Sequence, residues 1–110
     1  MLTNCSNIFK GATPPKLGET FETLLSVSNI TIKRIVSSSH IDSELMCQDE
    51  DEWFIMIEGA ATIMIGNKRQ ELVSGDYCFI EAKKPHQILS VKEGTIWLAV
   101  HVCEQRALLL

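Results

Sequence analysis

Several features that are common in proteins are absent from this sequence or scarce in it. No apolar stretch among its 110 residues approaches the roughly 20 that a membrane-spanning helix needs. The first ten residues show no basic segment followed by an apolar one, so no signal peptide is visible. Basic residues are outnumbered, with 10 Lys and Arg against 14 Asp and Glu. Nucleic-acid binding needs a clustered basic face, so we predict no nucleic-acid partner. Without a membrane-spanning stretch or a signal peptide, we predict a cytoplasmic protein that does not bind membranes.

Paired cysteines are also lacking. Cys5, Cys47, Cys78 and Cys103 lie far apart in the chain, and no C-x-x-C spacing indicates a zinc knuckle. Without a secretory signal we expect reduced thiols. The chain contains no nucleophile elbow, phosphate loop or dinucleotide-binding fingerprint either. The sequence therefore gives no motif-based reason to assign the chain to the hydrolases or the nucleotide-binding proteins.

What the chain does contain is a series of short apolar segments separated by Gly, Asn, Asp and Ser. About seven or eight such segments, spaced roughly 8–12 residues apart, predict an all-β fold, an antiparallel sandwich or barrel. The length and the 45% hydrophobic content are typical of one globular domain. We predict an irregular N-terminal arm at residues 1–19, the β domain at residues 20–103, and a C-terminal tail at residues 104–110. The run at residues 21–27 fits either a strand or a helical turn.

Two segments, residues 53–57 and 96–103, are apolar at both odd and even positions. A strand that is apolar on both faces must be covered on both faces. A barrel has one interior, so the outer face must be covered by the arm around residues 21–25 or by a second copy of the chain. We predict a two-fold homodimer with Trp53 or Trp97 near its interface.

Two spacings carry a family resemblance. Glu52 is followed by Gly59 after six intervening residues, and Gly75 precedes His86 by eleven positions. These spacings resemble parts of the two motifs of small single-domain cupins of the conserved-barrel type, G-x5-H-x-H-x3or4-E-x6-G and G-x5-P-x-G-x2-H-x3-N. The resemblance covers about residues 30–103. It implies a jelly-roll-like double-stranded β-helix.

Both motifs are degenerate in this chain. The two histidines of the first motif fall on Met46 and Gln48 with the shorter spacer, or on Leu45 and Cys47 with the longer one. The proline, glycine and asparagine of the second motif are also replaced, by Glu81, Lys83 and Ser90. The resemblance is therefore stronger for the fold than for the chemistry.

The resemblance implies a partial metal site. Of the four residues that bind metal in metal-loaded cupins, Glu52 and His86 carry over directly, and Gln48 is a weaker third because an amide oxygen can bind a hard cation. Such a set would hold one divalent transition metal, Fe, Mn, Ni or Zn, or no metal at all. An inward carboxylate and imidazole are costly to bury unless they pair with each other, a metal or a ligand. Alternation along the strands adds the expected pocket residues Met46, Phe54, Met56, Ile88 and His101.

The sequence thus predicts a barrel that binds a small molecule, with an unknown reaction. If it is an enzyme, the resemblance implies metal-assisted oxygenase, isomerase or lyase chemistry on a small polar substrate. In a metal-free version, Glu52 and His86 would form an acid–base pair. The alternative is a non-catalytic barrel for ligand sensing or protein contact, with a vestigial site, and the missing histidines favour it. Fold alone does not decide between the two.

Overall fold

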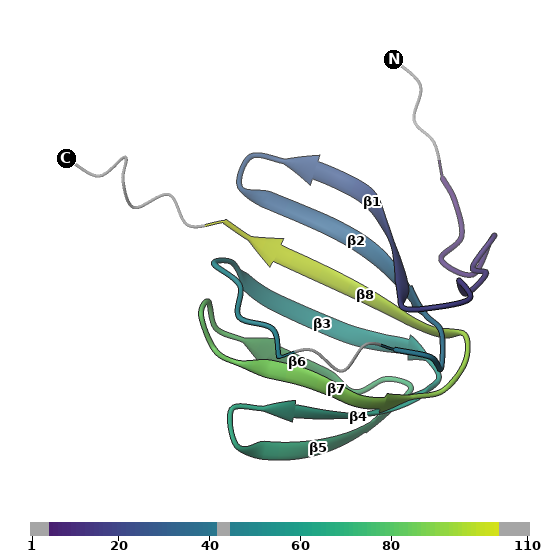
Figure 1. The fold of residues 1–110 in the computed structure, drawn as a ribbon. Coiled ribbons are helices and arrows are strands. Elements are labelled where there is room, and N and C mark those ends of the chain that lie inside the picture. Colours follow the sequence, from purple (N-terminus) through teal and green to yellow (C-terminus); the bar gives the residue numbers. More distant parts are fainter. Residues whose placement is uncertain (1–4, 42–44, 104–110) are drawn as a thin grey trace.

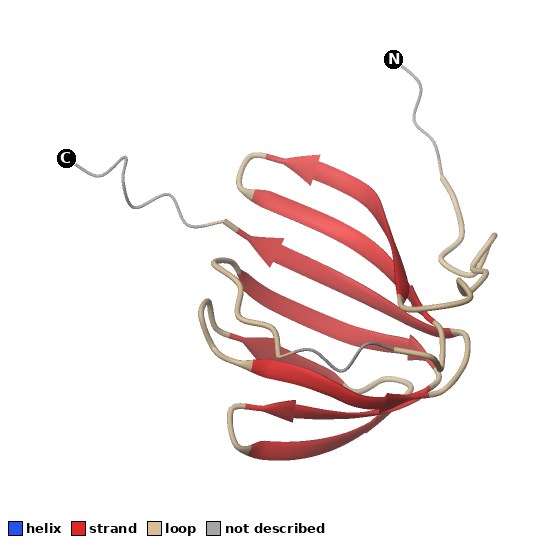
Figure 2. Ribbon diagram, in the orientation of Figure 1, coloured by secondary structure: helices blue, strands red, loops and turns tan. Residues whose placement is uncertain are grey.

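The computed structural model describes residues 5–41 and 45–103, which form two antiparallel sheets (Figures 1 and 2). The first sheet has the strand order β1-β2-β8-β3-β6, and the second has the order β5-β4-β7. No helix that could span a membrane occurs in the described part of the chain. The eight described strands are β1 (Glu19–Val27), β2 (Ile30–Ser37), β3 (Asp51–Glu58), β4 (Ala60–Ile65), β5 (Lys68–Val73), β6 (Tyr77–Ile80), β7 (His86–Val91) and β8 (Thr95–Val102).

The predicted all-β, jelly-roll-like fold is confirmed. Residues 5–18 form no regular strand, and β1 starts at Glu19, one residue before the predicted start of the domain. The predicted tail, residues 104–110, lies outside the described residues. One expectation is wrong. Residues 21–25 do not cover the outer face of the sheet, because they belong to β1, which pairs with β2 and extends the sheet sideways.

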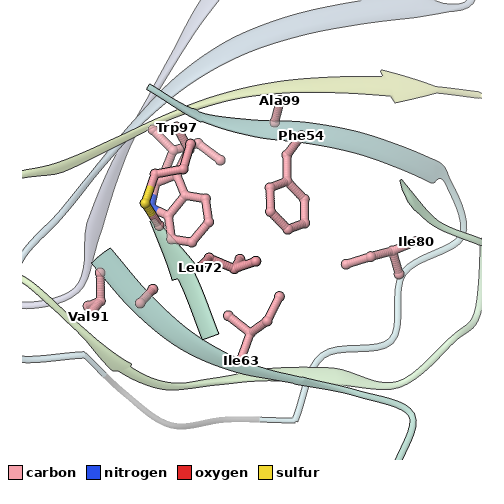
Figure 3. Close-up of a cluster of buried hydrophobic side chains, with 10 residues drawn as sticks. Phe54, Ile63, Leu72, Ile80, Val91, Trp97 and Ala99 are labelled. Carbon is pink, nitrogen blue, oxygen red and sulfur yellow. The ribbon is translucent and has the colours of Figure 1, made fainter. Parts of the chain in front are cut away.

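The hydrophobic core lies between the two sheets (Figure 3). Phe54 on β3 and Trp97 on β8 meet edge to face, with ring centroids 5.3 Å apart. Ile63 on β4 and Leu72 on β5 approach them from the second sheet. Burial of these large apolar side chains is the main favourable contribution to folding, at roughly 1.5–3 kcal/mol each.

Trp97 is an interior residue of the single chain, so it is the weaker of the two tryptophans predicted to lie near a dimer interface, and the dimer itself stays a prediction. Its side chain is buried, and its indole N–H donates a 2.9 Å hydrogen bond to the hydroxyl of Ser37, which is buried as well. Trp53 lies on the opposite face of the first sheet, where its ring contacts Tyr77 at a centroid distance of 5.7 Å. Of the two tryptophans, only Trp53 remains a candidate for an interface.

Between β3 and β4 the chain passes from the first sheet to the second through a single residue, Gly59. Strand β3 ends at Glu58 and β4 begins at Ala60, so Gly59 must make the whole change of direction. Its φ angle is +122°, a conformation that side-chain-bearing residues rarely adopt. A Cβ atom there would clash with the hydroxyl oxygen of the buried Thr95. Glycine is therefore required at this crossing by both backbone conformation and space.

We expect Gly59→Ala to destabilise the protein more than Gly94→Ala. Both glycines have positive φ, but a Cβ at Gly94 would meet nothing within 4 Å. Gly94→Ala should therefore cost only the backbone strain, roughly 1–2 kcal/mol, and Gly59→Ala about 2 kcal/mol more from overpacking against Thr95. Urea unfolding of the three proteins measures the difference. Equal losses for the two variants would contradict the packing argument.

Candidate functional site: an interior cavity with two carboxylates and two imidazoles

A cavity of about 100 Å³ lies in the interior, lined by residues from both sheets and from the loop before β3. Most of its lining is apolar, supplied by Phe21, Ile35, Met46, Phe54, Ile63, Ile80, Ile88 and Trp97. The polar lining consists of Glu19, Gln48, Glu52, His86, Gln87 and His101. Of these fourteen residues, Phe21 and Met46 are the most exposed and mark its opening. The site therefore combines an apolar body with a small number of ionisable groups.

Glu52 and His101 face each other because β3 and β8 are paired. The two residues are direct register partners in the antiparallel ladder. Both share the inner face of their strands, since Phe54 follows Glu52 by two positions and Ala99 precedes His101 by two. The Oε2 atom of Glu52 lies 3.4 Å from Nε2 of His101. The other oxygen of Glu52, Oε1, accepts a 2.8 Å hydrogen bond from the amide of Gln48.

These neighbours set the ionisation of Glu52. Burial is the largest single influence, and by itself it raises the pKa of the carboxyl. The contacts with His101 and Gln48, together with electrostatic interactions with His101 and His86, lower the pKa of the Glu52 carboxyl and outweigh burial. The pKa of Glu52 therefore lies below its ordinary value of 4.5, and at neutral pH the cavity contains a carboxylate.

His86 is held by backbone contacts on both sides. Its amide and carbonyl exchange hydrogen bonds of 2.9 and 2.7 Å with Met46, an isolated bridge that ties the loop before β3 to the start of β7. Its Nδ1 lies 3.0 Å from the carbonyl oxygen of Lys84. Because a carbonyl only accepts, Nδ1 carries the proton, and in the neutral ring the lone pair is on Nε2. The ring is thus oriented to act as a base or ligand through Nε2.

His101 is the least satisfied polar residue of the site. The side chain is buried, and within residues 5–41 and 45–103 neither ring nitrogen makes a hydrogen bond. The nearest carboxylates, those of Glu50 and Glu52, lie 3.5 and 3.4 Å away without hydrogen-bond geometry. A buried polar group without a partner is costly, typically about 1–3 kcal/mol. The ring is therefore placed to gain from a ligand or water that enters the cavity.

Sequence reasoning missed Glu19, a second carboxyl group in the lining. It accepts a 2.6 Å hydrogen bond from Ser37, which in turn accepts one from Trp97. Burial raises the pKa of Glu19, the hydrogen bond from Ser37 lowers it in part, and the charge of Glu52 raises it further, so the net shift is upward. The sequence places Glu19 in the predicted arm, whereas in the structure it alternates with Phe21 onto the cavity face of β1. Only the pairing of β1 with β2 brings it to the site.

The structure brings most of the residues expected from the sequence to this cavity. Gln48, Glu52 and His86 line it, as do four of the five expected pocket residues, Met46, Phe54, Ile88 and His101. Met56 does not line it. It lies two positions beyond Phe54, fully buried in the hydrophobic core. Alternation along β3 correctly predicts that the side chain of Met56 faces inward. It does not predict how far the cavity extends along the strand.

Comparison with known proteins settles the family. A family model described as a cupin domain matches residues 40–101, more than half of the chain. The chain belongs to the cupin family. No curated protein matches this cupin.

Solved structures agree with this assignment. The cupin is similar to a proposed mannose-6-phosphate isomerase from Ralstonia eutropha JMP134, with 25% identity and a TM-score of 0.81 over 93% of this chain and 100% of that one. It is also similar to an RmlC-like cupin from Shewanella frigidimarina, with 13% identity and a TM-score of 0.71 over 82% and 80% of the two chains. KdgF from Halomonas sp. matches with 10% identity and a TM-score of 0.72 over 84% and 86%. The last two likenesses are of fold alone.

The donor set fits a metal ion only in part. Within the described residues, no three His, Cys, Asp or Glu side chains are grouped so that they could share one metal ion. The groups at hand are the carboxylate of Glu52, Nε2 of His86 and the amide of Gln48, and that amide already bonds to Glu52. Stable metal sites usually have three or four protein ligands. A metal at this site would need a rearrangement of Gln48 or His101.

The two carboxyl groups of the cavity should affect stability in opposite directions. The lowered pKa of Glu52 means that its contribution is complete above pH 4.5 and is lost as the pH falls through the folded-state pKa. The raised pKa of Glu19 means that its contribution is complete below pH 4.5 and is lost as the pH rises through the folded-state pKa. At pH 7 we therefore expect Glu52→Gln to lower the free energy of unfolding and Glu19→Gln to raise it.

Urea unfolding at pH 7 and again below pH 4.5 measures both effects. Each difference from the unchanged protein should shrink in acid, since the carboxyl groups are then increasingly protonated in both the folded and the unfolded state. Glu71→Gln, at an exposed position on β5, is the matched control and should change little at either pH. A loss of stability for both Glu19→Gln and Glu52→Gln at pH 7 would contradict the assignment.

Proposed function

We propose that this cupin binds a small molecule in the interior cavity through Glu52, Gln48, His86 and His101. The observation that carries the proposal is the buried ring of His101, which lies beside the ionised Glu52 but makes no hydrogen bond within the described residues. A ligand that hydrogen-bonds to this ring would remove the cost of burying it without a hydrogen bond. The apolar part of the lining would contact the rest of the molecule. At about 100 Å³ the cavity is smaller than the roughly 150 Å³ cavity that accommodates benzene, so larger ligands would project through the opening.

The charges of the lining favour a neutral or cationic ligand. Glu19 and Glu52 contribute two carboxyl groups, and no Lys or Arg is among the described residues that line the cavity. A phosphate group would meet these carboxyl groups without a fixed cation to offset its charge. We therefore propose that this cupin does not share a sugar-phosphate substrate with the similar protein from Ralstonia eutropha. A molecule with an apolar body and an amine or hydroxyl donor would complement Glu52 best.

The same groups could move a proton on a bound molecule. Nε2 of His86 carries the lone pair of the neutral ring, and Glu52 is ionised at neutral pH. This arrangement supports acid–base chemistry without a metal. If a metal is bound, Glu52 and His86 would hold it with help from Gln48, and it would supply Lewis-acid polarisation of a substrate oxygen. Without catalysis the site would serve ligand sensing.

Ligand charge can be tested with three probes, benzylamine, mannose and mannose 6-phosphate. We expect benzylamine to raise the melting temperature and mannose 6-phosphate to leave it unchanged. In calorimetric titration, Glu52→Gln should weaken benzylamine binding at least tenfold, because a charged hydrogen bond contributes roughly 1.5–3 kcal/mol. Glu71→Gln, outside the cavity, should bind like the unchanged protein. Binding of mannose 6-phosphate that strengthens in Glu52→Gln would overturn the proposed ligand class.

The metal content of the purified protein distinguishes a metal-free site from a metal-dependent one. We expect untagged protein to contain a substoichiometric amount of Fe, Mn, Ni or Zn in plasma mass spectrometry, because the described donors number fewer than a stable site needs. Soaking with each metal, followed by gel filtration, tests uptake. Stoichiometric metal that is lost in both Glu52→Gln and His86→Ala would establish the metal-dependent version instead.

A further inference from the structure

The two carboxyl groups of the cavity come from distant parts of the five-stranded sheet. Glu19 is the first residue of β1 and pairs with Ser37, the last residue of β2. Glu52 belongs to the row of register partners that contains Thr31 and His101, near the other end of β2. Ser37 and Thr31 are separated by about 20 Å along an extended strand. The two carboxyl groups therefore reach the cavity from positions well apart on the sheet.

Glu19 is held in place by a chain of buried side chains. The indole N–H of Trp97 donates a hydrogen bond to the hydroxyl of Ser37, and this hydroxyl donates a 2.6 Å hydrogen bond to Oε2 of Glu19. Ser37 is fully buried, and Trp97 is nearly so. Two residues of the protein interior thus fix the carboxyl group on the cavity side of β1. A ligand would meet its other oxygen, Oε1.

The two carboxyl groups act on each other through their charge. Burial is the main cause of the raised pKa of Glu19, the hydrogen bond from Ser37 opposes it, and the charge of Glu52 adds to it. No Lys or Arg is among the described residues that line the cavity. A positive charge near a carboxyl group favours its ionised form. A cationic ligand would therefore offset the unfavourable interaction between the two carboxyl groups.

The surface between the two carboxyl groups is apolar. Four lining residues supply it, two beside the glutamates on β1 and β3 and two on the strands between, which are Phe21, Phe54, Ile35 and Trp97. Such a surface suits a hydrocarbon chain with a polar group at each end. An ammonium group has three donors and no acceptor. At one end it can therefore bond both to Glu52 and to the buried ring of His101, which makes no hydrogen bond within the described residues.

We propose that the cavity binds a linear α,ω-diamine, with one ammonium group at Glu52 and the other at Glu19, and that Glu19 selects this class of ligand. The inference rests on the proposed function, because it adds a second point of contact to the same site. A monoamine would bind Glu52 and leave Glu19 without a cation. A ligand with a carboxylate at its second end would bring a third acidic group into the cavity.

The test compares hexylamine with 1,6-diaminohexane, which differ in the second amine, by calorimetric titration at pH 7. We expect the diamine to bind at least about tenfold more tightly, because it makes one more hydrogen bond between charged groups. Titrations of 1,4-diaminobutane and 1,8-diaminooctane bracket the chain length. Glu19→Gln should reduce the affinity for the diamine to that for hexylamine. Its binding of hexylamine should stay unchanged, which shows that the cavity of this variant is intact.

Glu22→Gln is the matched control. It removes the same charge from the opposite face of β1, where Glu22 binds Arg34 instead of lining the cavity. The diamine should keep its advantage over hexylamine in this variant. Glu52→Gln, in contrast, should weaken the binding of both amines.

The outcomes separate this inference from the proposed function. If hexylamine binds and none of the diamines binds more tightly, the inference is wrong and the proposed function stands. An advantage of the diamine that survives Glu19→Gln, or that Glu22→Gln removes equally, also overturns the inference. So does tighter binding of 6-aminohexan-1-ol than of 1,6-diaminohexane, because the second group of the ligand would then be neutral. If no diamine binds at all, the inference fails, and the benzylamine titration decides on the proposed function by itself.

Discussion

The pairing of β3 with β8 is the constraint on which the rest of the structure depends. These two strands occupy central positions in the five-stranded sheet, and both are apolar on both faces. Their register places Trp97, Phe54 and Ala99 toward the core and sets Glu52 beside His101. The same register aligns Trp53 with Val100 on the outer face. A slip of one residue would exchange the two faces, exposing the core residues and burying the outer ones.

The cavity contains more ionisable groups than a purely structural interior would need. Glu52 keeps its charge through Gln48 and the imidazoles, whereas Glu19 is shifted toward its protonated form by burial and by Glu52 itself. Two carboxyl groups in one pocket, with pKa values moved in opposite directions, are the usual basis for separate acid and base roles. The ring of His101, which makes no hydrogen bond within the described residues, adds a group to which a ligand could hydrogen-bond. These features support our proposal that the cavity binds a small molecule.

The outer face and the cavity are two consequences of one sheet. The inner faces of β3 and β8 carry the site, and their outer faces carry apolar residues such as Trp53 and Val100.

The sequence by itself determined the strand pattern, the one-residue-in-two alternation and the family, because these depend on local periodicity and on short spacings. Glu52, His86, Gln48 and the double-sided character of residues 53–57 followed from that information. Tertiary structure decided what local periodicity cannot contain: that β1 brings Glu19 into the cavity, that Met56 lies too deep to line it, and that Trp97 faces inward. Each of these depends on the depth of a cavity or on contacts between strands distant in sequence. Alternation assigns a residue to a face of its strand, but the packing of the two sheets decides what that face meets.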